Sequence, residues 1–182
     1  MFRIGIIGAG WIAHKMTLAL GYTDEACVYA IASRSEDKAR SFAEEHGIPM
    51  AYGSYEAMLD DPEVDLVYIA TPHSHHFAHA MLALEHGKPV LVEKAFTANA
   101  NEAKILIDTA RNKGLFITEA IWTRYMPLSH KIREIMDSGI IGEPRIITAT
   151  LCYMMEHKER IVKPELCGGA LLDLGVYAIN FA

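Results

Sequence analysis

The chain carries acidic, basic and phenolic side chains at places where a folded protein could use them for chemistry. Glu93 and Lys94 directly follow the apolar run 90–92, so they stand at the end of an expected strand. Asp173 and Tyr177 are four residues apart in an otherwise apolar stretch, which places both on one face of a helix. An ammonium, a carboxylate and a phenol can together move a proton and stabilise developing charge. The structural alternatives are a solvated strand end and the polar edge of an amphipathic helix.

A glycine-rich turn follows the first apolar run of the chain. It fits the dinucleotide-binding pattern G-x-G-x-x-[G/A] and consists of Gly8, Ala9, Gly10, Trp11, Ile12 and Ala13. Gly8 permits a tight turn, Gly10 lets the backbone approach a pyrophosphate at a helix N-terminus, and Ala13 allows close helix–strand packing. The alternative is a glycine turn without a ligand. Because the pattern lies between a strand and a helix, it favours a dinucleotide site.

The residues after the second expected strand bear on the choice of dinucleotide. NAD enzymes place an acidic residue there to bind the ribose 2′-hydroxyl, whereas this chain has Ser33, Arg34 and Ser35, followed by Lys38. An acid would repel a 2′-phosphate, but a charge-assisted hydrogen bond to it is worth roughly 1.5–3 kcal/mol. We therefore expect Ser33, Arg34 and Lys38 to bind the cofactor, with NADP favoured over NAD. The local alternative, compatible with this one, is a capping box of Ser33 with Glu36 beside a solvated Arg34.

Histidines are concentrated after the expected strand 66–70. Four of the nine lie within seven residues, namely His73, His75, His76 and His79. No cysteine or clustered acid lies nearby in the sequence, so a zinc site is disfavoured and no metal is expected. In doubly wound sheets the ligand lies at the carboxyl edge of the strands. We therefore expect a cofactor-binding loop made of Thr71, Pro72, His73 and His76.

Short apolar runs and amphipathic stretches alternate along the first 120 residues. The runs are rich in β-branched residues and span 4–7, 28–32, 66–70, 90–92 and 115–117. The helical patterns span 35–46, 75–86 and 99–113, and each ends just before a glycine. Such runs suit strands buried on both faces, and the alternation implies right-handed βαβ units. We predict an α/β fold with a doubly wound parallel sheet of the Rossmann type.

The pattern changes after about residue 120. A helix is predicted over 127–138, the stretch 145–154 alternates like an antiparallel strand, and a final helix follows Gly168 and Gly169. We place a domain boundary here, with 1–120 as an NAD(P)-binding Rossmann domain and 121–182 as a second, incomplete unit. Sixty-two residues are few for an independent domain, and its strand would have an exposed edge.

Composition excludes several classes of function. The chain has 182 residues, 51% hydrophobic and 22% charged, which suffices for a sizeable core and excludes a disordered class. Its net charge of −6 argues against a general nucleic-acid or anionic-membrane binder. The three cysteines are far apart, so we expect reduced thiols in a cytoplasmic protein. No run approaches the roughly 18 apolar residues of a membrane helix.

Taken together and in order, the segments GAGWIA, ATPHSHH, VLVEKA and GGALLDLGVY resemble the glucose–fructose oxidoreductase/inositol dehydrogenase family. The segment EAIWTRYMP is similar to the dihydrodiol dehydrogenase branch, whose members oxidise trans-dihydrodiols and aldoses with NADP. The resemblance implies that Lys94, Asp173 and Tyr177 are the catalytic residues. We also expect Glu93, Lys94 and Arg124 to contact the cofactor. The sequence departs from the family at Ala95, where most members have proline, so we expect Lys94 to be less tightly positioned.

The resemblance implies hydride transfer between the nicotinamide of NADP and a sugar, polyol or cyclic diol. Tyrosine has an unperturbed pKa of about 10, so only about 0.1% is ionised at neutral pH, and a nearby ammonium favours the phenolate. We expect Tyr177 to be the general base in oxidation and the acid in reduction. Lys94 is expected to be its electrostatic partner or a proton relay, and Asp173 to orient substrate or lysine.

Family members continue into a large antiparallel sheet that walls the substrate pocket and often forms the oligomer interface. The resemblance therefore implies that residues 121–182 begin an α+β substrate domain, and that the parent protein is a homodimer or higher homo-oligomer. Two alternatives stay open. One is a non-catalytic NADP-binding module, and the other is an interaction protein whose unpaired sheet edge recruits a partner chain. The sequence does not specify the substrate.

Overall fold

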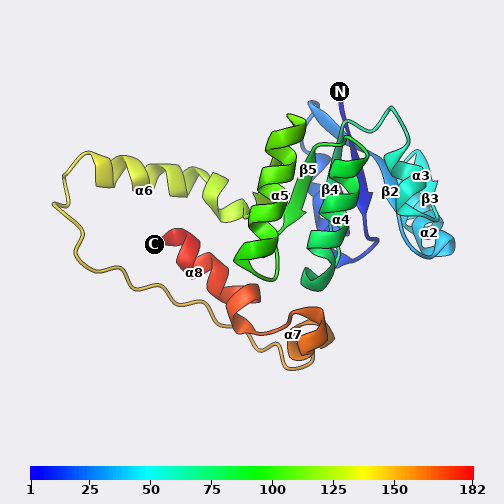
Figure 1. Cartoon of the computed structure of the whole chain (residues 1–182). Helices are drawn as coiled ribbons and strands as arrows, with labels where there is room; N and C mark the ends of the chain where they lie inside the picture. The colour runs from blue at the N-terminus through cyan, green and yellow to red at the C-terminus, as the bar shows by residue number, and fades with distance from the viewer.

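The computed structural model describes residues 1–182 without a gap and contains a six-stranded parallel sheet (Figure 1). The strands lie in the order β3-β2-β1-β4-β5-β6. Their bounds are β1 Phe2–Ile7, β2 Ala26–Ala32, β3 Met50–Tyr52, β4 Leu66–Ile69, β5 Val90–Glu93 and β6 Ile117–Ala120. The order reverses between β1 and β4, and this is the switch point where ligands bind in such sheets. The predicted α/β Rossmann fold is confirmed.

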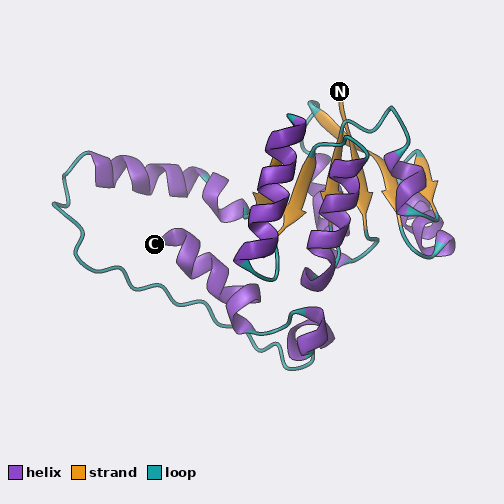
Figure 2. Cartoon of the chain, viewed as in Figure 1, coloured by secondary structure: helices purple, strands orange, loops and turns teal.

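Helices cover both faces of the sheet (Figure 2). On one face, α1 (Trp11–Leu20) and α2 (Glu36–His46) enclose a core with the side chains of Ile4, Ile6 and Ile31. The other face packs against α3, α4 and α5, which span Tyr55–Leu59, His73–Glu85 and Ala100–Lys113. Because successive side chains of a strand point to opposite faces, each apolar run supplies both cores.

The N-terminus of α2 differs from the predicted capping box. Ser35, and not Ser33, caps α2: its hydroxyl accepts a hydrogen bond from the backbone N–H of Lys38 at 3.4 Å. Ser33 instead prolongs the sheet, since its N–H donates to the carbonyl of Tyr52 at 3.1 Å. The Ser33 hydroxyl accepts the Ser35 N–H at 3.3 Å. The chain therefore leaves the strand at Ser33 and begins the helix two residues later than a Ser33 cap would require.

Residues 121–182, called here the C-terminal region, are built differently from the sheet region, residues 1–120. Short helical segments make up most of its regular structure, namely η1 Trp122–Tyr125, α6 Pro127–Asp137, α7 Glu159–Val162, η2 Pro164–Leu166, η3 Leu171–Gly175 and α8 Val176–Phe181. The predicted helices over 127–138 and after Gly169 are confirmed. None of the helices has the length and apolar character needed to cross a membrane.

The strand predicted over 145–154 is wrong. Residues 143–154 are exposed and follow an open arc between α6 and α7 (Figure 1). They lie in no ladder, and an isolated strand has no partners for its backbone N–H and C=O groups. The alternating pattern of the sequence is present, but this chain offers no neighbouring strand to pair with it.

Candidate active site

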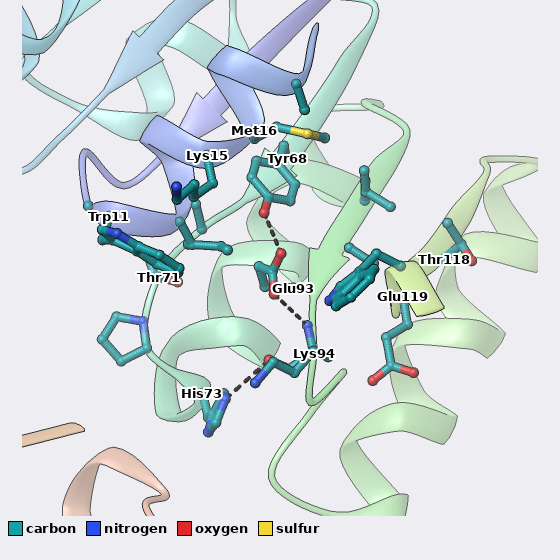
Figure 3. A pocket seen from close by; sticks show the side chains of 18 of the residues that line it. Trp11, Lys15, Met16, Tyr68, Thr71, His73, Glu93, Lys94, Thr118 and Glu119 are labelled. Carbon is teal, nitrogen blue, oxygen red and sulfur yellow. Dashed lines mark hydrogen bonds between the residues drawn. The ribbon is translucent and has the colours of Figure 1, made fainter. Parts of the chain in front are cut away.

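A cleft of about 870 Å³ lies where the carboxyl ends of the central strands meet the C-terminal region (Figure 3). Its walls come from the turn after β1, the loop after β4, the end of β5, and segments of the C-terminal region. The predicted site residues that line it are Gly10, Trp11, Ile12, Thr71, Pro72, His73, Glu93, Lys94 and Tyr177. Side chains far apart in sequence therefore share one cavity.

The glycine turn after β1 has the geometry of an anion-binding turn. Gly8 has a φ of +103°, and a Cβ there would lie 3.0 Å from the Thr71 side chain and 3.1 Å from the Ala70 carbonyl oxygen. Gly10 has open space around the position of a Cβ and is the N-cap of α1. No side chain caps this helix, and its first turn has no acidic residue, so its N–H groups are available to an anion. The turn fits a pyrophosphate.

Two buried histidines brace the loops that border the cleft. In His73, Nε2 lies 3.1 Å from the Lys94 carbonyl oxygen and Nδ1 lies 3.3 Å from that of Cys167. In His76, Nδ1 lies 2.7 Å from the Ala95 carbonyl oxygen and Nε2 lies 2.8 Å from that of Thr71. His73 lines the cleft, whereas His76 lies behind it. His73 thus lies between the loop after β5 and the C-terminal region, and His76 lies between the loops after β4 and β5.

Burial makes both rings poor bases. It lowers the pKa of His73, against the opposing effect of the Cys167 carbonyl. Burial also lowers the pKa of His76 to about 4, although the carbonyls of Thr71 and Ala95 favour the protonated ring. Both imidazoles are therefore neutral at pH 7, and each can donate only one hydrogen bond.

The structure brings the three predicted catalytic side chains together. The Nζ of Lys94 donates to Oδ1 of Asp173 at 3.0 Å and to the Asp173 carbonyl oxygen at 2.9 Å. The same Nζ lies 5.1 Å from the centroid of the Tyr177 ring. Trp122 Nε1 donates to the Tyr177 hydroxyl at 3.2 Å. The Lys94 and Asp173 side chains are only 14% and 3% exposed, so water screens this ion pair weakly.

Arg160 forms a second ion pair with Asp173. Its Nη1 donates to Oδ1 of Asp173 at 2.7 Å, and the arginine also lines the cleft. Burial alone would raise the pKa of Asp173, but hydrogen bonds from Arg160 and Lys94 outweigh it and hold the pKa below its usual range. Asp173 is thus ionised at neutral pH. Sequence reasoning missed Arg160, because it lies in a stretch without periodicity and only the fold brings it to Asp173.

Backbone contacts hold Lys94 despite the alanine that follows it. The Lys94–Ala95 peptide bond is cis. The Lys94 N–H donates to Oε2 of Glu93 at 3.1 Å, while the Lys94 carbonyl faces His73. Ala95 itself is buried, and its carbonyl faces His76. The histidine pair thus supports this loop at two successive carbonyl groups.

Tyr68 and Glu93 form a hydrogen-bonded pair on the floor of the cleft (Figure 3). The Tyr68 hydroxyl donates to Oε1 of Glu93 at 2.5 Å. Burial raises the pKa of Glu93, against hydrogen bonds from Tyr68 and the Lys94 N–H that lower it. Burial likewise raises the pKa of Tyr68, as does the neighbouring carboxylate. Sequence reasoning missed Tyr68, whose only signal was a polar group within an apolar strand.

The remaining predicted residues lie outside this cleft. Ser33 is buried at the end of β2, and Arg34 and Lys38 are exposed beside it. Arg34 lies near Tyr55: burial raises the pKa of that phenol, and the Arg34 guanidinium opposes the rise. The structure does not bring Arg124 to the cleft. It lines a separate hollow of about 1130 Å³ between η1, α6 and α8.

Fold and site together define a class, a Rossmann-type dinucleotide-binding protein with a charged cleft at the switch point. A family model described as "Oxidoreductase family, NAD-binding Rossmann fold" matches residues 2–120, and the GFO/IDH/MocA C-terminal domain model matches residues 129–182. The chain belongs to this GFO/IDH/MocA oxidoreductase family, as the sequence motifs predicted.

Individual relatives agree with the family match. The chain is 41% identical over 181 residues to trans-1,2-dihydrobenzene-1,2-diol dehydrogenase of Macaca fuscata fuscata, covering 98% of this chain and 54% of the relative. It is 51% identical over 140 residues to D-xylose 1-dehydrogenase (NADP(+)) of Hypocrea jecorina, covering 71% of this chain and 36% of the relative. The chain thus spans about half the length of the first of these relatives and a smaller share of the second.

Solved structures share the fold of the whole chain. A variant of a 3-ketoreductase from Actinomadura kijaniata, in complex with TDP-benzene and NADP, superposes with a TM-score of 0.83 at 33% identity. The match covers 98% of this chain and 55% of that one. An NAD-binding protein from Listeria innocua matches with a TM-score of 0.81 at 28% identity, over 99% of this chain and 53% of that one.

Proposed function

We propose that the protein is an NADP-dependent oxidoreductase that transfers a hydride between the nicotinamide and a hydroxyl or carbonyl carbon of a sugar, polyol or cyclic diol. The observation that carries this proposal is the buried Lys94–Asp173 ion pair against the Tyr177 ring, in the same cleft as the glycine turn. The relatives named above act on a diol, a sugar or a keto group, which supports the substrate class.

The cofactor would be held at the carboxyl edge of the sheet. Gly8 and Gly10 shape the turn, and the N–H groups of α1 would bind the pyrophosphate. Further contacts are assigned to the lining residues Trp11, Ile12, Thr71, Pro72, His73 and Glu93, with His76 supporting the loop. NADP, when bound, supplies the nicotinamide carbon that takes or gives the hydride.

The chain's own residues would move the proton. Trp122 donates to the Tyr177 oxygen, so the phenolic proton is free to point elsewhere, and the Lys94 ammonium lies over the same ring. In oxidation, Tyr177 would act in its phenolate form, and the substrate hydroxyl would pass its proton to that oxygen, directly or through Lys94, as the C–H bond gives up its hydride. In reduction, the same groups return the proton to the new alkoxide. Asp173 fixes the lysine, and Arg160 fixes Asp173.

Substitution in the intact protein tests these roles. Lys94→Met and Tyr177→Phe should each lower kcat by about 10²–10⁴-fold, the usual contribution of a positioned acid–base group, and leave the NADPH dissociation constant within about threefold. Lys104→Met, on an exposed lysine of α5, is the matched control and should keep full turnover. Full turnover in either site variant would overturn the assignment.

The preference for NADP is assigned to the end of β2. Ser33, Arg34 and Lys38 follow β2 on the side where the 2′-phosphate would reach, and the residue directly after the strand is Ser33 and not an acid. Arg34→Ala should weaken NADP binding by about tenfold, equivalent to about 1.4 kcal/mol, and leave NAD binding unchanged. Arg40→Ala, an exposed arginine of α2 paired with Glu36, serves as control. Equal losses for both cofactors would contradict this assignment.

The substrate class can be identified by measuring turnover of a panel of aldoses, cyclic diols and dicarbonyls, with NADP and NAD in parallel. Turnover of any of them supports the oxidoreductase. Tight NADPH binding without turnover of any compound would instead indicate a non-catalytic module with the same fold.

We also propose how the chain divides into domains, where the protein acts in the cell and how it assembles. Residues 1–120 are assigned to dinucleotide binding and 121–182 to the beginning of the substrate domain. All three cysteines are free thiols, as suits a reducing cytoplasm. Large apolar side chains such as Ile146, Ile147 and Met154 are exposed along the arc, which supports a homodimer or higher homo-oligomer. Light scattering on the intact protein tests this, and a monomer would contradict it.

A further inference from the structure

Two histidines and a glutamate meet on the face of the sheet covered by α1 and α2. His14 comes from the first half of α1, and Glu45 and His46 are the last two residues of α2. None of the three lines the cleft described above. The oxidoreductase chemistry proposed above therefore makes no use of them.

Their ligand atoms have the separations of a small-ion site. The distance from His14 Nδ1 to His46 Nε2 is 3.0 Å. Glu45 Oε1 lies 3.9 Å from the first of these nitrogens and 3.7 Å from the second. A tetrahedral Zn²⁺ with bonds of about 2.0–2.1 Å separates its ligand atoms by about 3.3–3.4 Å. The observed distances lie on both sides of that value and differ from it by up to about 0.6 Å, so movement of the exposed Glu45 side chain would complete the coordination shell.

The surroundings favour a cation. The His46 side chain is only 7% exposed, and its ring packs against Phe42 with centroids 4.5 Å apart, which fixes its direction. His46 ends α2, where the carbonyl end of the helix dipole attracts positive charge. Glu45 adds a formal negative charge from the solvent side. His14 is partly exposed, which leaves access for the ion and for a water molecule as fourth ligand.

We propose that His14, Glu45 and His46 form a binding site for a divalent transition-metal ion of the zinc type. Two imidazoles and one carboxylate are a donor set found in open zinc sites, and imidazole also suits copper and nickel. The ion would join α1, whose N-terminus faces the cleft, to α2, which follows the residues assigned to the 2′-phosphate. Its role is to fix these two helices against each other, with no part in the hydride step.

Metal titration of the intact protein, stripped with a chelator, tests the site. Calorimetry should detect saturable Zn²⁺ binding, and Co²⁺ should give the visible absorption of a tetrahedral site. His14→Gln should weaken binding at least about tenfold. Glu45→Gln should weaken it too, and because Glu45 is exposed, this variant tests the site without disturbing a buried side chain. His157→Ala, an exposed histidine outside the cluster, is the matched control and should bind as the parent does.

Two results would overturn the proposal. If no Zn²⁺ binds, the two histidines form only a hydrogen bond to each other. If binding persists in His14→Gln and Glu45→Gln and is lost in His75→Ala, the ion sits in the histidine loop after β4. NADPH binding, measured in parallel, should be the same in His14→Gln as in the parent. The test therefore stays separate from that of the proposed activity.

Discussion

The sheet region and the C-terminal region are held in place by different forces. Residues 1–120 contain two apolar cores, one on each face of the sheet. From residue 121 onward, only Ile121 and Asp173 are buried. One of these two is a charged side chain, and one of its two ion-pair partners, Lys94, belongs to the sheet region. The C-terminal region is thus attached largely by polar contacts.

The attachment coincides with the candidate active site. Asp173 contacts Lys94, and the Cys167 carbonyl contacts His73. Polar contacts are directional and individually weaker than the burial of an apolar core, so they fix geometry more than they add stability. Substitutions in the two regions should therefore have different effects. In the sheet region they should destabilise the whole fold, and in the C-terminal region they should detach that region from the sheet.

A core substitution in the sheet region should have the largest effect on stability. Leu84 of α4 is fully buried between the sheet and its helices. Leu84→Ala leaves a cavity and should lower the free energy of unfolding by about 4 kcal/mol. Denaturant unfolding followed by circular dichroism measures it, with Leu128→Ala on exposed α6 as control. If both variants cost the same, the proposed contrast between the regions is wrong.

Acid should weaken the sheet region through His76. Its folded pKa of about 4 lies below the unfolded value of 6.5, so the folded state binds fewer protons. The stability from the neutral ring is full above pH 6.5 and is lost as the pH falls toward 4. The loss at pH 4 amounts to about 3 kcal/mol. Unfolding measured from pH 7 to 4 should show a shallower slope in His76→Gln than in the parent, and identical slopes would argue against a buried neutral ring.

Removing the buried carboxylate should detach the C-terminal region selectively. Asp173→Ala leaves the cations of Lys94 and Arg160 facing each other without a counter-charge. A fully buried pair would cost about 3–5 kcal/mol, and partial exposure of Arg160 reduces this to about 2–3 kcal/mol. Hydrogen exchange of residues 160–181 should accelerate while the sheet keeps its protection. Asp137→Ala on exposed α6 is the control, and unchanged exchange in Asp173→Ala would refute the polar attachment.

A helix cap should give the smallest effect and refine the comparison within the sheet region. Ser35 caps α2, and Ser35→Ala should cost about 1 kcal/mol. Ser54→Ala, at the corresponding position of α3, offers a matched comparison in a helix of five residues. Thermal unfolding of both variants measures the difference. If Ser33→Ala lowers the free energy of unfolding more than Ser35→Ala does, the result would support the capping box of Ser33 with Glu36 that the sequence predicted.

Most of the sheet was predictable because β1, β2, β4 and β5 contain apolar runs. The last strand, predicted over 115–117, forms over Ile117–Ala120 instead, where Thr118 and Glu119 interrupt the apolar pattern. Met50–Tyr52 and Tyr55–Leu59 escaped prediction, since a strand of three residues and a helix of five are too short to show a period. The stretch 145–154 shows the opposite case. Its alternation is real, but forming a strand depends on a neighbour, which local sequence does not specify.

Much of the candidate site was predictable from its position at strand ends. Glycines and charged residues placed directly after apolar runs converge, because parallel strands share one carboxyl edge. Arg160 and Tyr68 could not be found in this way, since their partners, Asp173 and Glu93, reach them only through the fold. Arg124 lines another hollow, although Trp122 and Tyr125 of the same short helix line the cleft, and the sequence does not show which of these side chains points where.

The cleft also contains the chain's only two indole rings. Trp11 comes from the glycine turn and Trp122 from the C-terminal region, and both line the cleft. The tryptophan emission of the protein therefore originates almost entirely at this site. In Trp122→Phe the remaining emission would come from Trp11 and report on the glycine turn. In Trp11→Phe it would come from Trp122 and report on the side of the cleft next to Tyr177. Cofactor arrival and attachment of the C-terminal region can thus be followed separately, without an added label.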